Sequence, residues 1–432
     1  MYYIVRYTEF KSAADMPNSQ THSTKNPKNA HTPSETQSNY VDNSLLFPIQ
    51  TEVDTQTLEI HEVNTVEQFS KLRNTWNEVL RRSMDDSPFL TWEHIAVSVS
   101  DLKKNQKLRI LYITCSGKII AIAPLRQSFH HAGGIKYSVV EPLDYDTATD
   151  YNGIILAENE IACLSLFLSY FYRHKDWDFL CINDVPETSS IANILIKNSN
   201  LFPKFKIDKG AACPYFKFPD SMDNFLKGLG RNYRKNFARR LRNLSKDHGN
   251  VELREYDEIF TLEQGMQIFF DLHQKRWVSL GQKGAFHSTE IRRIFLERAE
   301  FFAEKGWFGL YFLTADGKPI AAKYCLKYNN KIYGCLSGFD PLFSQYSVGK
   351  TLLMKVVERG IQQGFNEYDF MKGEEVYKFK LADGFRRNLK ITFTNSKFSS
   401  QLLAIAISAE KTRKIGLLMG KLGRLYRKAR VA

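Results

Sequence analysis

Two charged residues in the C-terminal half have types and spacing suited to acid–base chemistry. Asp369 ends an apolar predicted strand, and Lys378 lies nine residues further on, in the helix predicted to follow. An Asp beside a Lys would stay ionised and orient an acceptor, while the ammonium would stabilise a developing negative charge. A purely structural ion pair fits these two residues equally well. Glu374 and Tyr377, on the same predicted helix, are secondary candidates for substrate binding.

Two further residues are candidate general bases. Asp340 precedes Pro341, and an Asp at such a position commonly begins a turn. His273 and Arg276 are three residues apart on a predicted helix and therefore share a face. A His near a cleft can act as a base at neutral pH, and Arg276 is a candidate for substrate binding. A lone helical His beside Trp277 is, however, more often a packed or surface residue.

A short turn carries the candidate residues for anion binding. The run Tyr346-Ser347-Val348-Gly349-Lys350-Thr351 opens a predicted helix. The first turn of a helix leaves backbone N–H groups unpaired, and the helix dipole favours negative charge there. Lys350 adds a full charge, and Gly349, without a Cβ, would let a ligand approach the backbone. The alternative is an ordinary helix start with Ser347 as N-cap.

The elements around these residues predict an α+β fold, with a mixed, partly antiparallel sheet flanked by helices. In the first half we predict strands at 108–114, 118–124 and 178–182, and helices at about 160–173 and 189–198. In the second half we predict helices at about 221–247, 259–279, 288–304, 349–363 and 374–382, and strands at 251–256, 307–314, 319–328, 331–338, 367–371 and 388–395.

The two halves also resemble each other. Residues 112–121 parallel residues 312–321, and each run alternates, turns at Gly-Lys and alternates again, which is typical of a β-hairpin. Further on, Trp177-Asp178-Phe179 parallels Tyr368-Asp369-Phe370. We therefore predict a tandem repeat of one fold. The first half has no counterpart of the glycine turn, so we expect the chemistry in the second.

Taken in order, the motifs resemble the GNAT acyltransferase superfamily. They are Gly338-Phe339-Asp340-Pro341, the turn 346–351, Tyr368-Asp369-Phe370-Met371-Lys372-Gly373 and Tyr377-Lys378. Within the superfamily they are similar to the branch that groups cellulose-biosynthesis-associated acetyltransferases with Fem-type peptidyl transferases. The resemblance implies tandem GNAT-like domains and transfer of an acyl group from acyl-CoA, in the first place acetyl-CoA, to an amine or hydroxyl of an envelope or polysaccharide-related acceptor. It also implies that the backbone N–H groups of residues 348–351 face the pyrophosphate.

Two other interpretations stay open. One is Fem-type aminoacyl transfer from aminoacyl-tRNA, and the other is a non-catalytic binding module with a GNAT fold. Under all three we expect a disordered segment at 1–50, an N-terminal GNAT-like domain at 51–212, a C-terminal GNAT acyltransferase domain at 213–398 and a basic amphipathic helix at 399–432.

The location of the positive charge indicates which classes of partner to expect. The net charge of +13 is concentrated in residues 231–242 and in the tail after Lys411. The first cluster fits an ordinary solvated helix face, or binding of an anionic acceptor or tRNA, and we do not predict DNA binding from it. The tail would either pack on the second domain or lie on an anionic membrane surface.

The cysteines and the apolar runs bear on the compartment. No apolar run has the roughly 18 residues of a membrane span, and no secretory signal is evident, so we expect a cytoplasmic protein, with peripheral contact at the inner face of the membrane if the tail binds lipid. No metal-ligand spacing or covalent-nucleophile motif is evident, so we expect no metal cofactor. The six cysteines show no CxxC pattern, and we expect buried free thiols: Cys115, Cys163, Cys181, Cys213, Cys325 and Cys335.

Overall fold

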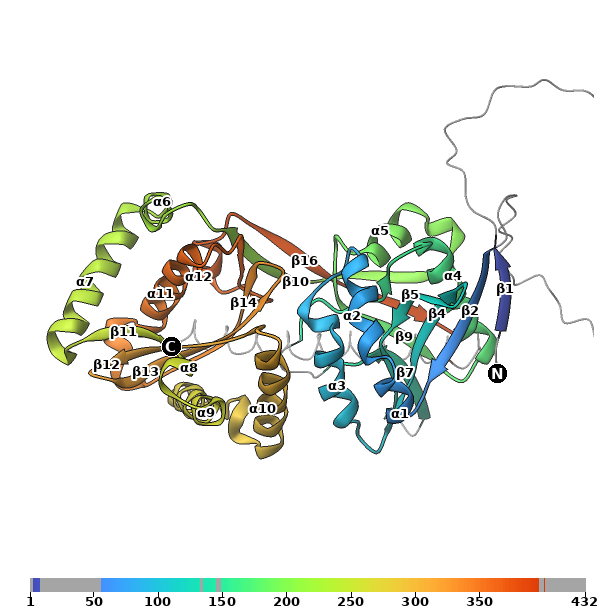
Figure 1. Ribbon diagram of the computed structural model, residues 1–432, viewed down its shortest axis with the longest axis horizontal. Helices are drawn as coiled ribbons and strands as arrows, with labels where there is room; N and C mark the ends of the chain where they lie inside the picture. Colours follow the sequence, from blue (N-terminus) through green and yellow to red (C-terminus); the bar gives the residue numbers. More distant parts are fainter. Residues whose placement is uncertain (1–2, 8–55, 133–134, 145–148, 396–399, 401–432) are drawn as a thin grey trace, which may run out of the picture.

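The computed structural model describes residues 3–7, 56–132, 135–144, 149–395 and 400. Two units lie side by side (Figure 1), and two long antiparallel strands, β10 (Phe205–Lys217) and β16 (Gly384–Thr394), run between them. The predicted C-terminal helix and most of the N-terminal segment lie outside the described residues. Within the described ranges, no helix is long and apolar enough to cross a membrane.

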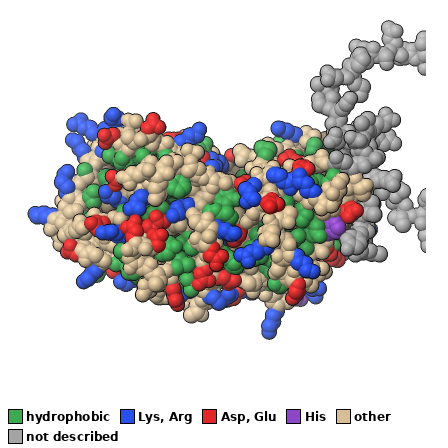
Figure 2. Space-filling model, in the orientation of Figure 1, with side chains coloured by type: hydrophobic (Ala, Val, Ile, Leu, Met, Phe, Trp, Pro, Cys, Tyr) green, Lys and Arg blue, Asp and Glu red, His purple; other side chains and the backbone are tan. Residues whose placement is uncertain are grey.

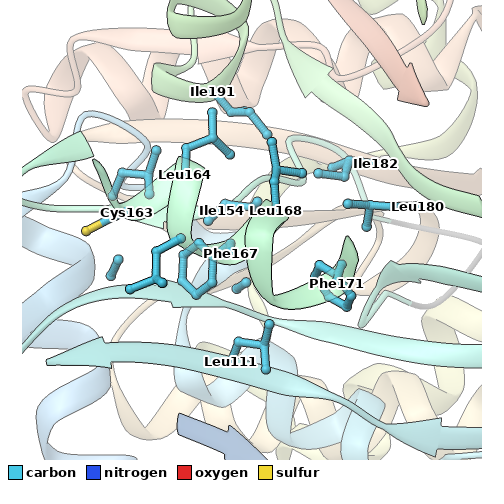
Figure 3. Close-up of a cluster of buried hydrophobic side chains, with 14 of the residues drawn as sticks. Leu111, Ile154, Cys163, Leu164, Phe167, Leu168, Phe171, Leu180, Ile182 and Ile191 are labelled. Carbon is cyan, nitrogen blue, oxygen red and sulfur yellow. The ribbon is translucent and has the colours of Figure 1, made fainter. Parts of the chain in front are cut away.

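The first unit packs helices against a five-stranded sheet of order β1-β2-β4-β5-β8. Its core gathers Leu111, Phe167, Phe171 and Leu180 between the strands and α4 (Figure 3). Its elements are β1 (Tyr3–Tyr7), β2 (Gln56–Val63), α1 (Val66–Ser70), α2 (Arg73–Arg82), α3 (Trp92–Ser100), β3 (Gln106–Leu108), β4 (Ile110–Cys115), β5 (Lys118–Ala123), β6 (Leu125–Ala132), β7 (Ile135–Pro142), β8 (Ile155–Leu156), α4 (Glu160–His174), β9 (Phe179–Pro186) and α5 (Ser190–Lys197).

The expected disorder of residues 1–50 is wrong for Tyr3–Tyr7, because that segment pairs as β1 with β2. Residues 8–50 lie outside the described residues, so their expected disorder stays a prediction.

In the second unit, α9 and α10 cover one face of the sheet and α11 covers the other. Its elements are α6 (Met222–Gly228), α7 (Arg231–His248), β11 (Val251–Glu255), α8 (Tyr256–Ile259), α9 (Leu262–Ser279), α10 (Thr289–Glu304), β12 (Phe308–Ala315), β13 (Lys318–Tyr328), β14 (Lys331–Phe339), η5 (Pro341–Tyr346), α11 (Val348–Gln362), β15 (Glu367–Asp369) and α12 (Val376–Phe379). The predicted helix 221–247 is two helices, because Leu229 is extended and Gly230 caps α7. The predicted helix 374–382 is only the short α12.

The two units share one sheet, which differs from the expected boundary between residues 212 and 213. The larger sheet has eleven strands in the order β11-β12-β13-β14-β15-β10-β16-β9-β7-β6-β3. Strand β10 spans the expected boundary, and β16 pairs with β9 of the first unit. Leu389, Ile391 and Phe393 of β16 accordingly pack in the first unit's core.

The repeat predicted from the Gly-Lys turns is confirmed down to the register. In the β4–β5 hairpin Leu111 faces Ala123, and in the β12–β13 hairpin Tyr311 faces Lys323. Both hairpins shift register at the same place, just before the turn. Each turn has a residue with positive φ before its glycine, which is typical of a type I′ turn.

Strands β14 and β15 separate part-way along β14. Only Lys331–Tyr333 pair, in parallel, with Glu367–Asp369. Immediately afterwards β14 shifts register against β13, so that Gly334 and Cys335 together oppose Cys325. Within the described part of the chain, no strand pairs with the outer edge of β14 beyond this bulge. No strand there competes with a ligand for the β14 backbone, although the Ser337 carbonyl accepts from Arg276.

Candidate active site

A pocket of about 180 Å³ lies at the start of α11, beside α7. Arg240 of α7 donates to the hydroxyl of Ser347 (2.5 Å), and Lys350 lines the same pocket. Its lining is Tyr233, Asn236, Phe237, Arg240, Ser347, Lys350 and Thr351. The pocket therefore combines a helix N-terminus with two cationic side chains, an arrangement suited to a phosphate or another anion.

The backbone at this helix start partly supports the predicted anion site. Ser347 is the N-cap residue, but its hydroxyl makes no capping hydrogen bond, because it accepts from Arg240 instead. The amides of Lys350 and Thr351 donate to the Ser347 carbonyl (2.9 and 3.1 Å), so they are already used. Within the described residues, the amides of Val348 and Gly349 have no partner and remain available to an anion.

The surroundings of Gly349 leave room for a Cβ, although its place in the motif predicts that a ligand would need the space. A Cβ at this position would lie 3.6 Å from the Phe339 ring, which is an ordinary contact. Gly338 is the tightly packed glycine of the motif, since a Cβ there would lie 2.2 Å from the backbone nitrogen of His273. Gly338 thus lets α9 pack closely on β14.

Asp369 lies at the boundary of the two units and is fully buried, with 1% of its surface exposed. Its carboxylate accepts hydrogen bonds from the Tyr151 hydroxyl (2.6 Å), the Arg386 guanidinium (3.2 Å) and the Met371 amide (2.8 Å). Burial raises the pKa of Asp369 to about 6, although these donors oppose the rise. A carboxyl with a pKa near neutrality suits a general base.

The predicted pair of Asp369 and Lys378 is wrong. Lys378 donates to the Lys372 carbonyl (2.9 Å) and pairs with Glu375 (3.1 Å), whereas the cation beside Asp369 is Arg386. The chain reverses between the two residues, at Met371 (φ 61°) and Gly373, and each side chain finds another partner.

The other candidates on α12 and the segment before it have different surroundings. Glu374 is exposed, whereas Tyr377 is half-buried and packs against the second unit's core. Burial raises the pKa of Tyr377 to about 12.

Asp340 begins a turn, which was the alternative to its role as a general base. It accepts from the Leu342 amide (3.1 Å) and so caps η5, and it pairs with Lys275 (2.9 Å). Partial burial opposes ionisation, but the hydrogen bonds from Lys275 and Leu342 outweigh it and lower the pKa of Asp340. A weakly basic carboxylate in an ion pair is poorly suited to act as a general base.

His273 is packed into the core. Its Nε2 accepts from the Trp277 indole (2.9 Å), and only 3% of its surface is exposed. Burial, with a smaller effect of Arg276, lowers the pKa of His273 to about 4. Arg276, by contrast, reaches Ser337 on β14 and donates to its carbonyl and hydroxyl, both at 3.2 Å. Arg276 is therefore close to the edge where β14 and β15 part.

Sequence reasoning assigned no role to several polar residues of the site. Arg386 bonds to both Asp369 and Glu367, and Tyr151 reaches Asp369 from 218 residues earlier in the chain. Lys372 bridges Asp150 (3.1 Å) and Asp184 (3.0 Å) of the first unit. Lys372 lies in the Asp369 motif and Arg240 in the basic run that the sequence singled out, but nothing local indicates Tyr151 or Arg386.

Two pockets lie where the units meet. One, of about 110 Å³, is lined by Tyr151, Tyr333, Asp369 and Arg386 among others. The second, of about 340 Å³, is lined by Asp144, Asp184, Lys372 and Lys390 among others. Among the described residues, no group of three or more His, Cys, Asp or Glu side chains could hold a metal ion. All six cysteines are free, and Cys163, Cys213 and Cys325 are buried.

Comparison with known proteins agrees with this arrangement. Residues 231–379 match the family model described as an acetyltransferase (GNAT) domain. Over these residues the chain is similar to GNAT acetyltransferase domains. The match begins at α7 and ends at α12, so the matched region includes the α11 pocket, the parting strands and Lys378.

Solved structures extend the likeness to both units. The crystal structure of FemX superposes with a TM-score of 0.54 at 9% identity, covering 79% of this chain and 99% of that one. A conserved protein of unknown function from Bacteroides thetaiotaomicron gives 0.50 at 11% identity, covering 78% and 100%. A tandem GNAT protein from the clavulanic acid biosynthesis pathway gives 0.42 at 10% identity, covering 78% and 98%. Among curated proteins no sequence matches significantly. The α+β fold, with its repeated hairpin, is thus similar to that of FemX over both units.

Proposed function

We propose that this protein transfers an acyl group from acyl-CoA, in the first place acetyl-CoA, to an amine or hydroxyl. The observation that carries the proposal is the α11 pocket, where Arg240 and Lys350 lie at the start of a helix whose first two amides, of Val348 and Gly349, have no partner among the described residues. This arrangement suits a pyrophosphate, which needs several backbone donors together with cationic charge. It lies at the end of β14, whose outer edge is unpaired beyond its bulge.

The reaction needs three further contributions. The nucleophile must reach the thioester carbonyl within about 3–3.5 Å, lose a proton and displace the thiolate. Backbone N–H groups at the unpaired β14 edge would polarise the carbonyl. Asp369 would accept the proton, because its pKa of about 6 leaves it ionised at neutral pH and it lines a pocket between the units. Tyr151 and Arg386 would hold its carboxylate in place.

Calorimetry on the full chain tests donor binding. We expect CoA and acetyl-CoA to bind and pantetheine, which lacks the pyrophosphate, to bind far more weakly. The variant Arg240→Ala should weaken CoA binding about tenfold or more, the scale of a lost charge-assisted hydrogen bond. Arg242→Ala is the matched control, because Arg242 lies on the same helix but does not line the pocket. A full chain that binds no CoA would overturn the proposal.

Turnover is then measured as thiol release with panels of amine and sugar acceptors. An envelope or polysaccharide-related acceptor, such as a glycan precursor, is the first class to try, and this choice rests on the resemblance to the cellulose-associated branch. A cytoplasmic location, with the C-terminal segment on the inner face of an anionic membrane, belongs to the same proposal. Binding of CoA without turnover of any acceptor would favour a non-catalytic binding module.

One observation favours aminoacyl transfer from tRNA as a second candidate. Helix α7 carries seven Lys and Arg residues, and among the described residues none of them pairs with a carboxylate. Basic side chains gather at this end of the molecule (Figure 2). An extended cationic helix suits a polyanion better than a single pyrophosphate. Retention of tRNA at low salt, lost steeply as salt rises, together with no CoA binding, would establish this candidate.

A further inference from the structure

Lys323 is a buried cation without a partner. It lies in the middle of β13, and only 7% of its surface is exposed. Within the described residues, no carboxylate or carbonyl accepts a hydrogen bond from its ammonium. Its Nζ lies over the Tyr368 ring, 5.9 Å from the ring centroid. The neighbouring thiols of Cys325 and Cys335 are neutral, because burial raises the pKa of both.

The charges around Lys323 increase the free-energy cost of burying its ammonium group. Burial lowers the pKa of Lys323, and repulsion from Lys378 and Arg276 acts in the same direction with a smaller effect. Arg276 donates to Ser337, the residue directly opposite Lys323 on β14. The only carboxylate that contacts these three cations in the described structure is Glu375, which bonds to Lys378 and is itself 56% exposed. A buried excess of positive charge costs free energy unless an anion compensates it.

The location points to a ligand as that anion. Lys323 shares a face of β13 with Ala321 and Cys325, beneath α11. Ser337 and Arg276 place this cluster at the part of β14 whose outer edge is unpaired. The cluster therefore lies beside the same edge as the proposed thioester.

The fold does not itself require a lysine here. Ala123 occupies the equivalent position of the first unit, in a hairpin of the same register. A small apolar side chain thus satisfies this place in the sheet, and the lysine must serve something other than the architecture.

We propose that Lys323 and Arg276, with Lys378 beside them, form a binding site for a carboxylate carried by one of the two substrates. The carboxylate belongs either to the acyl group of the donor, as in a dicarboxylic acyl-CoA, or to the acceptor. This inference rests on the proposed function, since it names the chemical class of a substrate at that site.

The first test needs no CoA. Succinate is titrated into the full chain and followed by calorimetry and thermal shift, with Lys323→Met as the variant. Lys318→Met is the matched control, because it removes one exposed positive charge from the same strand. We expect succinate to bind wild type and Lys318→Met and to bind Lys323→Met at least tenfold more weakly. Equal binding to all three would overturn the proposal.

The second test separates the two sources of the carboxylate. Succinyl-CoA and acetyl-CoA are compared in binding, and an amino acid and its carboxamide are compared as acceptors in thiol release. Preference for the carboxylate in one of these pairs, lost in Lys323→Met, identifies the substrate that carries it. No preference in either pair overturns the proposal even if CoA binds. If the full chain binds no CoA, the proposed function is overturned. The succinate titration then tests by itself whether Lys323 and Arg276 bind a carboxylate.

Stability provides the control for folding. Removing an unpaired buried charge leaves stability unchanged or raises it, so Lys323→Met should melt at or above the wild-type temperature without ligand. A clear fall in melting temperature would show that Lys323 has a structural role, against the proposal.

Discussion

The two units present the same backbone with opposite charges. Helices α4 and α11 both begin after a residue in the left-handed conformation, Asn159 (φ 48°) and Ser347 (φ 54°), and neither residue caps its helix with its side chain. The first turn of α4 carries Glu160, whereas α11 has no acidic residue there and has Lys350 and the approaching Arg240. The backbone donors are common to both units, so a few charges decide which helix start attracts an anion.

The largest expected effect comes from making the second unit resemble the first. The double variant Arg240→Ala/Lys350→Glu removes both cations and places an acid at the start of α11. We expect the KM for the donor to rise about 10³-fold, because two charge-assisted contacts are lost and repulsion is added. Steady-state kinetics at fixed ionic strength measure it. A change below threefold would show that the donor's phosphates bind elsewhere.

The reciprocal change checks the same comparison. Glu160→Lys gives α4 a cation in its first turn but no counterpart of Arg240. We expect no second CoA-binding event in calorimetry. A new site of comparable affinity would mean that the helix start alone suffices.

A somewhat smaller effect is expected at the repeated aspartates. Asp369→Asn should lower kcat about 10²-fold if the carboxylate is the base, and the wild-type rate should rise with pH up to about 6 and then level. Asp178 lies at the matching motif position in the first unit and accepts from Ser138 and Ser400. Asp178→Asn should leave the pH profile unchanged. Equal losses in both variants would remove the catalytic role.

The same carboxyl affects stability with a definite sign. Because the folded pKa of Asp369 is raised to about 6, the folded state holds its proton more tightly than the unfolded state. Stability therefore falls as pH rises between about 4 and 6, and this contribution is absent in Asp369→Asn. We expect the melting temperature of wild type, relative to that of Asp369→Asn, to fall as pH rises from about 4 to about 6.

Two glycines of the motif should differ in their cost to stability. Gly338→Ala places a Cβ against the backbone of α9 and should destabilise the protein by roughly 1–3 kcal/mol or more. Gly349→Ala meets only the Phe339 ring and should change the donor KM by less than about threefold, because its Cβ makes an ordinary contact. Denaturant melts measure the stability of Gly338→Ala, and steady-state kinetics measure the donor KM of Gly349→Ala. A neutral Gly338→Ala would contradict the close approach.

The smallest effect concerns the two hairpin turns. Ser116 and Asp316 both have positive φ, and Asp316 also accepts from the Asn250 amide (3.0 Å). Ser116→Gly should stabilise the first unit by a few tenths of a kcal/mol, whereas Asp316→Gly should gain nothing because it loses that hydrogen bond. Paired denaturant melts resolve the difference. Equal gains would show that the Asn250 contact is worth nothing.

Local features of this fold were predictable from sequence. The hairpins were found because a Gly-Lys turn between alternating strands fixes its own register within ten residues. The start of α11 was predictable in the same way. Strand β10 was not, since it contains Gly210 and Pro214 among charged residues and is stabilised by β15 and β16 from far along the chain.

The site was predictable only in part for the same reason. Residues of the Asp369 motif were found, but their partners Tyr151 and Arg386 come from outside it. Lys378 was paired with the wrong acid because sequence spacing does not show how a chain reverses at a residue with positive φ. Lys323 gave no local signal, since a lysine in an alternating strand usually faces solvent.

The crossing of β16 into the first unit has a consequence for biosynthesis. Leu389, Ile391 and Phe393 of β16 complete a core whose remaining residues lie between Leu58 and Phe202, nearly two hundred or more positions earlier. A nascent first unit therefore leaves the ribosome without its closing strand, and its β9 edge stays unpaired until β16 has been translated. The two halves cannot mature one after the other, so assembly is a single late event, and until then a chaperone has an unpaired strand edge to cover.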